Sequence, residues 1–205
     1  MVQRTGSVAE LLDCVAAPND GAGRSLLIGI SGFGGAGKST LAADLARQLP
    51  GSALIAGDDF IRTRPCTCRS SDWSCMDFDR LRGQVLEPVR SGDIARYQSY
   101  DWEKGRPGPW VSLDGVKVVI VEGLGLFQDG LSEAFDLRVW IDVDLESATQ
   151  MGMWRDEHVF DNPQVELWEQ VWMPNDADFL AKHRPDLAAD VLYSPAPLPL
   201  PPNTE

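Results

Sequence analysis

Short apolar runs separated by polar and helix-like segments divide the chain. Four of these runs predict strands, namely Ser25–Ile30, Ala53–Ala56, Val116–Val121 and Leu137–Val143. They are mostly apolar rather than regularly alternating, which is typical of strands buried on both faces of a parallel sheet. The segment Ser39–Gln48 between the first two runs is helix-like. This β-α-β order predicts an α/β fold with helices on both faces of a parallel sheet.

Further elements are predicted between and around these strands. A helix is expected over Asp77–Leu86, where Asp77 can cap the first turn, and a short N-terminal helix follows the capping-box pattern Ser7–Glu10. The loop Glu103–Trp110 predicts the tip of a hairpin, because its prolines exclude a central strand. Trp168 and Trp172 are spaced as a packing face of a helix. The proline-rich tail 194–205 is expected to be extended or disordered.

Composition limits the class of protein. A chain of 205 residues is suited to one domain. We expect no membrane association and a cytoplasmic location, because no apolar run reaches the length of a membrane span and no signal peptide is evident. A net charge of −13 argues against a nucleic-acid surface.

The chemistry is concentrated in a glycine-rich segment. Gly32–Ser39 fits the phosphate-binding pattern G-x-x-x-x-G-K-[ST], and it lies between a predicted strand and a predicted helix. The pattern predicts a site for ATP, in which Lys38 reaches the β- and γ-phosphates and Ser39 binds Mg²⁺. The expected nucleotide contacts are Gly34, Gly35, Ala36, Gly37, Lys38, Ser39 and Thr40.

Acidic residues follow two of the other strands. Asp58 and Asp59 come directly after the second apolar run, and Glu122 ends the third. Open α/β sheets place their ligands at the carboxyl ends of strands, so a carboxylate here can orient an attacking hydroxyl and Glu122 can complete a Mg²⁺ site. The alternative is that the two aspartates only cap a helix or stabilise a turn.

The segment Arg62–Arg106 differs from the rest of the chain in charge. It contains nine Lys or Arg and seven Asp or Glu, although the whole chain has 18 and 31. This local excess is compatible with a solvated surface or with a face toward phosphates or an anionic substrate. We expect Arg62–Trp73 to form a mobile flap over an acceptor site. Cys66, Cys68 and Cys75 are too few for a structural zinc site, and free thiols are expected.

An ordered set of motifs resembles the uridine kinase and phosphoribulokinase branch of P-loop small-molecule kinases. After the phosphate-binding loop come Asp58-Asp59-Phe60, Tyr100-Asp101-Trp102, Val121-Glu122-Gly123 and Arg155-Asp156. The stretch from Leu167 to Val191 also looks like bacterial uridine kinase-like proteins, so the resemblance runs from about Ser25 to Tyr193.

The resemblance implies a fold and a set of roles. The fold is a three-layer P-loop NTPase domain over 1–193 with a five-stranded parallel sheet, an acceptor-side insertion at about 61–114 and a lid at about 145–162. By matching residues, the catalytic groups are Asp58 as base, Lys38 and Arg155, and the metal ligands are Ser39 and Glu122. The acceptor is expected to contact Asp59, Phe60, Arg62, Asp77 (or its neighbour Asp79), Tyr100 and Asp101.

Two positions depart from that family. Ile61 stands where uridine kinases usually carry a tyrosine of the nucleoside pocket, and Met151 stands where the lid usually carries an earlier arginine. The first departure argues against uridine itself as acceptor. The second predicts slower transfer unless another basic residue substitutes, with Arg62, Arg64 and Lys182 as candidates.

The sequence therefore predicts an ATP- and Mg²⁺-dependent kinase that phosphorylates a hydroxyl of a nucleoside-like or sugar-like small molecule. Two alternatives remain at this point, namely a nucleotide-dependent ATPase switch and a kinase-like binding protein with little turnover. The guanine-specific tetrapeptide Asn-Lys-x-Asp does not occur in the chain, which argues against a GTPase switch. The sequence does not identify the acceptor, and it leaves open a homodimer.

Overall fold

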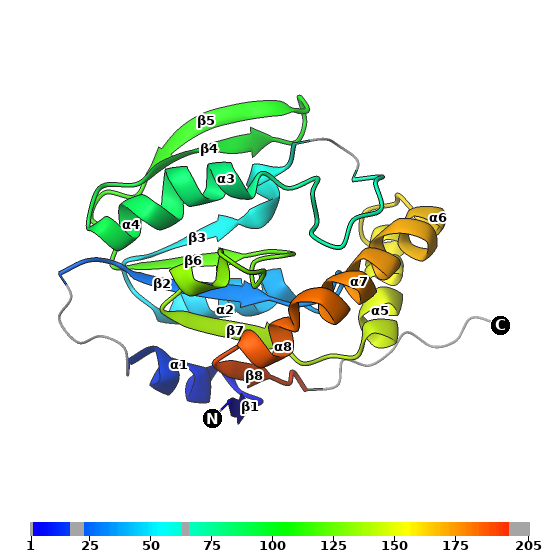
Figure 1. Cartoon of the computed structure of the whole chain (residues 1–205), viewed down its shortest axis with the longest axis horizontal. Coiled ribbons are helices and arrows are strands. Elements are labelled where there is room, and N and C mark those ends of the chain that lie inside the picture. Colours follow the sequence, from blue (N-terminus) through cyan, green and yellow to red (C-terminus); the bar gives the residue numbers. More distant parts are fainter. Residues whose placement is uncertain (1, 17–22, 63–65, 197–205) are drawn as a thin grey trace.

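A parallel sheet forms the centre of the molecule (Figure 1). The computed structural model describes residues 2–16, 23–62 and 66–196. The strand order is β1-β8-β7-β2-β6-β3, and every pair in this sheet is parallel. The strands are β1 (Gln3–Thr5), β2 (Leu26–Ser31), β3 (Ser52–Ala56), β6 (Val118–Glu122), β7 (Leu137–Ile141) and β8 (Val191–Tyr193). The four strands predicted from apolar runs are confirmed, with small shifts at their ends.

The sheet has six strands, so the expectation of five is wrong. The additional strand is β1, which pairs with β8 in the register Gln3 to Val191. Its residues Gln3-Arg4-Thr5 contain no apolar side chain, and only Thr5 is buried. Backbone pairing at the edge of the sheet, rather than side-chain burial, therefore creates this strand, and a hydrophobic pattern cannot reveal it.

Helices cover both faces of the sheet. All six residues of β2 are buried, and successive side chains of a strand point to opposite faces, so both faces must be covered. The main helices are α1 (Val8–Ala16), α2 (Lys38–Gln48), α5 (Leu145–His158) and α7 (Met173–His183). The shorter ones are α3 (Phe78–Leu81), α4 (Glu87–Ser91), α6 (Val165–Leu167) and α8 (Pro185–Ala188). Short 3-10 turns η1 (Gly57–Phe60) and η3 (Ser132–Ala134) complete the set. None of the helices within the described ranges has the length and apolar character to cross a membrane.

Two helical segments contain a π-turn directly before a proline. One π-turn is η2 (Arg82–Leu86), which joins α3 to α4 ahead of Pro88, and the other is η4 (Trp168–Trp172), which leads into α7 ahead of Pro174. A proline inside a helix lacks an amide proton and its ring clashes with the carbonyl four residues earlier. The wider π-turn relieves that clash and lets each helix continue.

A separate hairpin confirms the predicted hairpin, but its turn is shorter than the predicted Glu103–Trp110, because its second strand already begins at Arg106. Strands β4 (Arg96–Asp101) and β5 (Arg106–Ser112) form a two-stranded antiparallel sheet. Pro107 and Pro109 lie in β5. Each strand of a two-stranded sheet has a free edge, so the missing proline amides need not break the pairing.

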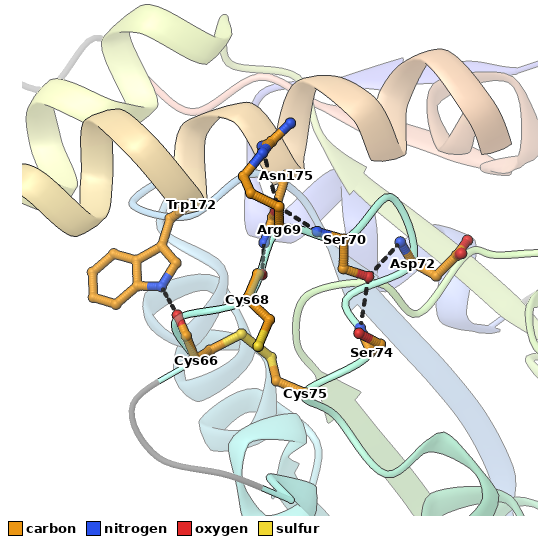
Figure 2. The surroundings of a disulfide bond; sticks show 9 residues. All are labelled: Cys66, Cys68, Arg69, Ser70, Asp72, Ser74, Cys75, Trp172 and Asn175. Carbon is orange, nitrogen blue, oxygen red and sulfur yellow. Dashed lines mark hydrogen bonds between the residues drawn. A yellow bond between two sulfur atoms is a disulfide. The ribbon is translucent and has the colours of Figure 1, made fainter.

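A disulfide closes the segment that follows η1. Cys66 and Cys75 are bonded to each other, so the expectation that these thiols are free is wrong for this pair, while Cys68 and Cys14 are free (Figure 2). The turn between them is held by Ser70 Oγ, which accepts from the amides of Asp72 and Ser74 at 3.1 and 3.0 Å. This local turn brings the two cysteines together, and spacing alone does not reveal it. No cluster of three or more metal-binding side chains occurs within the described ranges.

We expect the disulfide to contribute measurably to stability. The bond closes a loop with a sequence separation of 9. Such a short loop restricts the unfolded chain by about 2 to 3 kcal/mol, so Cys66→Ser with Cys75→Ser should lower the free energy of unfolding in urea by about that amount.

The control is Cys68→Ser, which removes a free, exposed thiol from the same loop. It should leave the urea midpoint unchanged. A thiol titration of the denatured, unreduced wild type should find two free thiols, and a count of four would contradict the bond.

Candidate functional site

The phosphate-binding loop connects β2 to α2 as the sequence predicts. Gly35 and Gly37 have positive φ angles of 81° and 93°, which glycine adopts at little cost. A Cβ at Gly35 would lie 2.0 Å from the carbonyl oxygen of Ala148 on α5, so no side chain fits there. The amides of Gly35, Gly37 and Lys38 have no acceptor within the described part of the chain. The loop is therefore built to present amide donors to an anion.

Lys38 is a buried cation within this loop. Its ammonium donates to the carbonyl oxygen of Phe33 at 2.8 Å. Burial lowers the pKa of Lys38, and the carboxylates of Glu122, Asp176 and Asp58 oppose that shift. The ammonium thus lies among three acidic side chains that come from three different elements.

Ser39 and Glu122 form a pair of oxygen donors. Ser39 Oγ donates to Glu122 Oε1 at 3.0 Å, and burial raises the pKa of Glu122. The pair forms because β6 lies beside β2 with Ile30 opposite Glu122, so both strands end at the same edge. A serine hydroxyl and a carboxylate are ligands that Mg²⁺ accepts. Thr40 follows on the first turn of α2 and is exposed.

Asp58 faces the same edge from η1. Its side chain is open to solvent, yet enough protein surrounds the carboxylate that desolvation raises its pKa. The positive charges of Lys38 and Arg155 act in the opposite direction. A carboxylate with a raised pKa is a better proton acceptor than an ordinary aspartate.

Asp59 and Phe60 join η1 to the hairpin. Asp59 Oδ1 accepts from the amide of Tyr100 at 2.8 Å. Phe60 is buried and stacks on Tyr97 of β4 with 5.7 Å between ring centroids. Arg80 lies over the Phe60 ring and donates to the carbonyl oxygens of Gln98, at 2.9 Å, and of Asp59. Both predicted acceptor residues thus have structural partners in the hairpin.

The remaining predicted acceptor residues lie around the start of α3 and on the hairpin. Asp77 caps α3 by accepting from the amide of Arg80, and it pairs with Arg62 at 3.0 Å. Tyr100 is half-buried, and its ring lies 5.0 Å from that of Trp102. Asp101 pairs with Lys104 at the turn of the hairpin.

The surface of the described residues has a hollow near the predicted acceptor residues and a larger one elsewhere. The one near these residues has a volume of about 240 Å³, and its lining includes Arg62, Phe78, Arg82 and Gln128. A larger one of about 690 Å³ lies at the amino ends of β2 and β6, beside Ser25. The phosphate-binding loop follows the carboxyl end of β2, so the larger hollow is remote from it. The smaller hollow is bordered by Arg62, one of the predicted acceptor residues, whereas Lys38, Asp58 and Glu122 do not line it.

Arg155 extends from α5, the segment expected to be the lid. Its guanidinium donates to Asp156 Oδ1 at 2.8 Å and is half exposed. Asp156 is buried and accepts from the indole of Trp168 at 2.8 Å. Met151 is half-buried on the same helix.

The three basic residues considered as substitutes for the missing lid arginine lie in different places. Arg62 is held by Asp77, and Lys182 on α7 pairs with Asp72 at 2.7 Å. Arg64 lies outside the described residues.

Asp176 on α7 is a member of the site that sequence reasoning missed. Its Oδ2 accepts from the amide of Gly34 at 2.7 Å, and only 3% of the residue is exposed. Burial raises the pKa of Asp176 to about 6, although Lys38 and the Gly34 amide oppose the shift. The sequence did contain one sign of this contact, because Asp176 lies four residues after Trp172, which itself lies four residues after Trp168.

The raised pKa of Asp176 predicts a pH-dependent cost in stability. Its folded-state pKa of about 6 lies above the ordinary value of 3.8, so the folded state binds the proton more tightly. The protonated Asp176 carboxyl therefore adds to the free energy of unfolding at low pH, and this contribution is lost as the pH rises to about 6. Asp176→Asn should raise the free energy of unfolding by about 1 to 3 kcal/mol at about pH 7.5, with little change at about pH 4.

Urea denaturation at the two pH values measures this difference. Glu169→Gln is the matched control, because it removes one negative charge from an exposed position in the preceding turn. A gain for Asp176→Asn that is equal at both pH values would contradict the prediction.

Comparisons with known proteins agree with this geometry. Rat nicotinamide riboside kinase 1 is 28% identical over 104 residues, which cover 51% of this chain and 52% of that protein. A uridine kinase of Clostridium perfringens is 27% identical over 144 residues, 65% of this chain and 69% of that enzyme. This chain thus spans about half the length of the rat kinase. No protein-family model matches the chain.

A solved structure shares the fold. The "Possible Uridine Kinase" of Bacillus stearothermophilus superposes with a TM-score of 0.68 at 21% identity, covering 91% of this chain and 96% of that one. The phosphate-binding loop, the fold and the sequence relatives all point in the same direction. The chain is similar to uridine kinases and to related P-loop small-molecule kinases.

Proposed function

We propose that this chain is an ATP-dependent kinase that transfers the γ-phosphate to a hydroxyl of a nucleoside-like or sugar-like small molecule. One observation carries the proposal. Lys38, the Ser39–Glu122 pair and Asp58 lie around one edge of the sheet, where three strands end. These are the groups that phosphoryl transfer requires, namely a phosphate-binding cation, metal ligands and a base.

The donor side fits Mg²⁺–ATP. A Cβ at Gly37 would meet nothing within 4 Å, and the amides of Gly35, Gly37 and Lys38 are available as donors. When bound, Mg²⁺–ATP supplies the phosphoryl group, and Ser39 with Glu122 would hold the metal. Lys38 would exchange its bond to the Phe33 carbonyl for the phosphates and so offset their negative charge.

Asp58 is the proposed base. The carboxylate orients the acceptor hydroxyl and accepts its proton as the oxygen attacks. Arg155 extends from α5, and its positive charge opposes the rise in the pKa of Asp58, so it lies within electrostatic range of the reaction. To contact a phosphate, Arg155 must turn away from Asp156. We propose that α5 acts as this lid, and that Met151 makes the lid poorer in positive charge than in uridine kinases.

The acceptor side is proposed from the insertion at about 61–114. Arg62, Asp77, Tyr100 and Asp101 supply charged and aromatic groups suited to hydroxyls and a planar ring, and Asp59 and Phe60 hold the hairpin in place. The names of the relatives, nicotinamide riboside kinase and uridine kinase, support an acceptor that contains a riboside.

Uridine itself is not the acceptor that we favour. Ile61 forms an isolated antiparallel bridge with Met76 and packs against a small apolar cluster that includes Trp73 and Phe179. An isoleucine in that cluster offers no hydroxyl group to the nucleobase of uridine.

Acceptor-dependent ADP release tests the proposal. With Mg²⁺–ATP, we expect one class in a panel of nucleosides, nicotinamide riboside, sugars and sugar phosphates to raise turnover well above the rate without acceptor. Asp58→Asn should lower kcat by about 10²- to 10⁴-fold, because the amide cannot accept the proton.

Since burial raises the pKa of Asp58, the acidic limb of the wild-type kcat/KM profile should lie above the pH at which an ordinary aspartate titrates.

Asp44→Asn is the matched control, because it removes a carboxylate that pairs with Arg47 on the outer face of α2. It should leave kcat unchanged. Tight ATP binding with no response to any acceptor would contradict a kinase within this panel and would favour an ATPase switch or a binding protein.

The Ser39–Glu122 pair, which we propose holds Mg²⁺, gives a separate prediction. Glu122→Gln replaces a carboxylate that accepts from Ser39 with a neutral amide. The Mg²⁺ concentration needed for half-maximal activity should rise by about 10- to 100-fold. A Mg²⁺ titration of ADP release at fixed ATP measures this shift, and an unchanged titration curve would exclude Glu122 from the metal site.

A further inference from the structure

Asp176 touches the phosphate-binding loop but has no part in the reaction proposed above. Its carboxylate accepts from the amide of Gly34 at 2.7 Å, and it is one of the carboxylates whose charge acts on Lys38. Burying a carboxylate lowers the stability of the protein at neutral pH. Residues that reduce stability next to a ligand site are commonly kept for function.

Gly34 is held from two sides. A Cβ on Gly34 would lie 3.0 Å from the Trp168 ring and 3.5 Å from Asp176 Oδ2, so the backbone there fits closely against both residues. The bond to Asp176 uses only the Gly34 amide and leaves those of Gly35, Gly37 and Lys38 free for phosphates. Asp176 can therefore fix the start of the loop without blocking the anion site.

Asn175, the residue before Asp176 on α7, binds a second loop. Asn175 is fully buried, and its Oδ1 accepts from the Ser70 amide at 2.8 Å and from Arg69 at 3.1 Å. Its Nδ2 donates to the carbonyl oxygen of Cys68 at 3.0 Å (Figure 2). One turn earlier, Trp172 donates to the carbonyl oxygen of Cys66 at 2.8 Å.

Consecutive side chains of α7 thus bind two loops that are far apart in sequence. One is the phosphate-binding loop, and the other is the loop Cys66–Cys75, which leads into α3 and its capping residue Asp77. A rigid helix that contacts both can transmit a displacement from one loop to the other.

We propose that Asp176 is a positioning residue of the phosphate-binding loop, and that α7 couples this loop to the loop Cys66–Cys75 through Asp176 and Asn175. The inference rests on the proposed function, because it assumes that the phosphate-binding loop receives a nucleotide. In this arrangement Asp176 orders Gly34 before the nucleotide arrives, and nucleotide binding orders the acceptor side through the helix.

Mg²⁺–ATP binding measured by calorimetry tests the positioning role. Asp176→Ala removes the acceptor of the Gly34 amide and should weaken binding by at least about tenfold, which corresponds to the lower end of the loss of one hydrogen bond to a charged group. Asp176→Asn keeps an oxygen that can accept from Gly34 and should restore most of the affinity. Glu169→Gln is the control, and it should bind as the wild type does.

The outcomes separate the two proposals. If wild type and Glu169→Gln do not bind the nucleotide, the proposed function fails. If they bind it and Asp176→Ala binds equally well or more tightly, the positioning role is overturned. Thermal unfolding of each variant checks that it is folded. If Asp176→Ala is not folded, Asp176→Leu, which also removes the acceptor but fills the space, takes its place in the binding test.

Hydrogen exchange tests the coupling. Adding Mg²⁺–ATP to the wild type should slow amide exchange in the phosphate-binding loop and also at Ser70–Ser74. In Asp176→Ala at saturating nucleotide, the protection at Ser70–Ser74 should be lost. If adding Mg²⁺–ATP to the wild type leaves the amide exchange of Ser70–Ser74 unchanged, the coupling is overturned, whatever the calorimetry shows for the Asp176 variants.

Discussion

A single buried ammonium and the carboxylates around it govern the organisation of the site. Lys38 interacts electrostatically with Glu122, Asp176 and Asp58, which come from β6, α7 and η1. None of these acids would be favourable there without a cation, because burial raises the pKa of each. The parallel sheet makes the arrangement possible, since its strands end at one edge and bring residues distant in sequence within electrostatic range.

The proposed acceptor side is organised differently, by hydrogen bonds to the backbone and by ring packing. Asp59 and Arg80 bind backbone groups of the hairpin, Phe60 stacks on Tyr97, and Asn175 holds the disulfide-closed loop. The proposed donor side is therefore organised mainly around charge, whereas the proposed acceptor side is held mainly by backbone hydrogen bonds and ring contacts.

The elements that depend on residues close together in the sequence could be predicted from the sequence alone. The four main strands, the helix after the P-loop, the cap at Asp77 and the hairpin follow from apolar runs, glycines and prolines near each residue. The edge strand β1, the Cys66–Cys75 bond and the contact of Asp176 with Gly34 could not be predicted. Each is a tertiary contact of a segment whose own residues are polar or ambiguous.

The π-turn at Trp168–Trp172 has a consequence for how the chain tolerates insertions and deletions. A π-turn contains one residue more than a regular helical turn, so the extra residue is absorbed within the turn itself. Deleting one residue there would restore regular winding and leave the rest of α7 facing almost the same way. Asp176 would then still face Gly34. A related chain without this extra residue can therefore keep the same contact beside its phosphate-binding loop with one residue fewer between the loop and the aspartate.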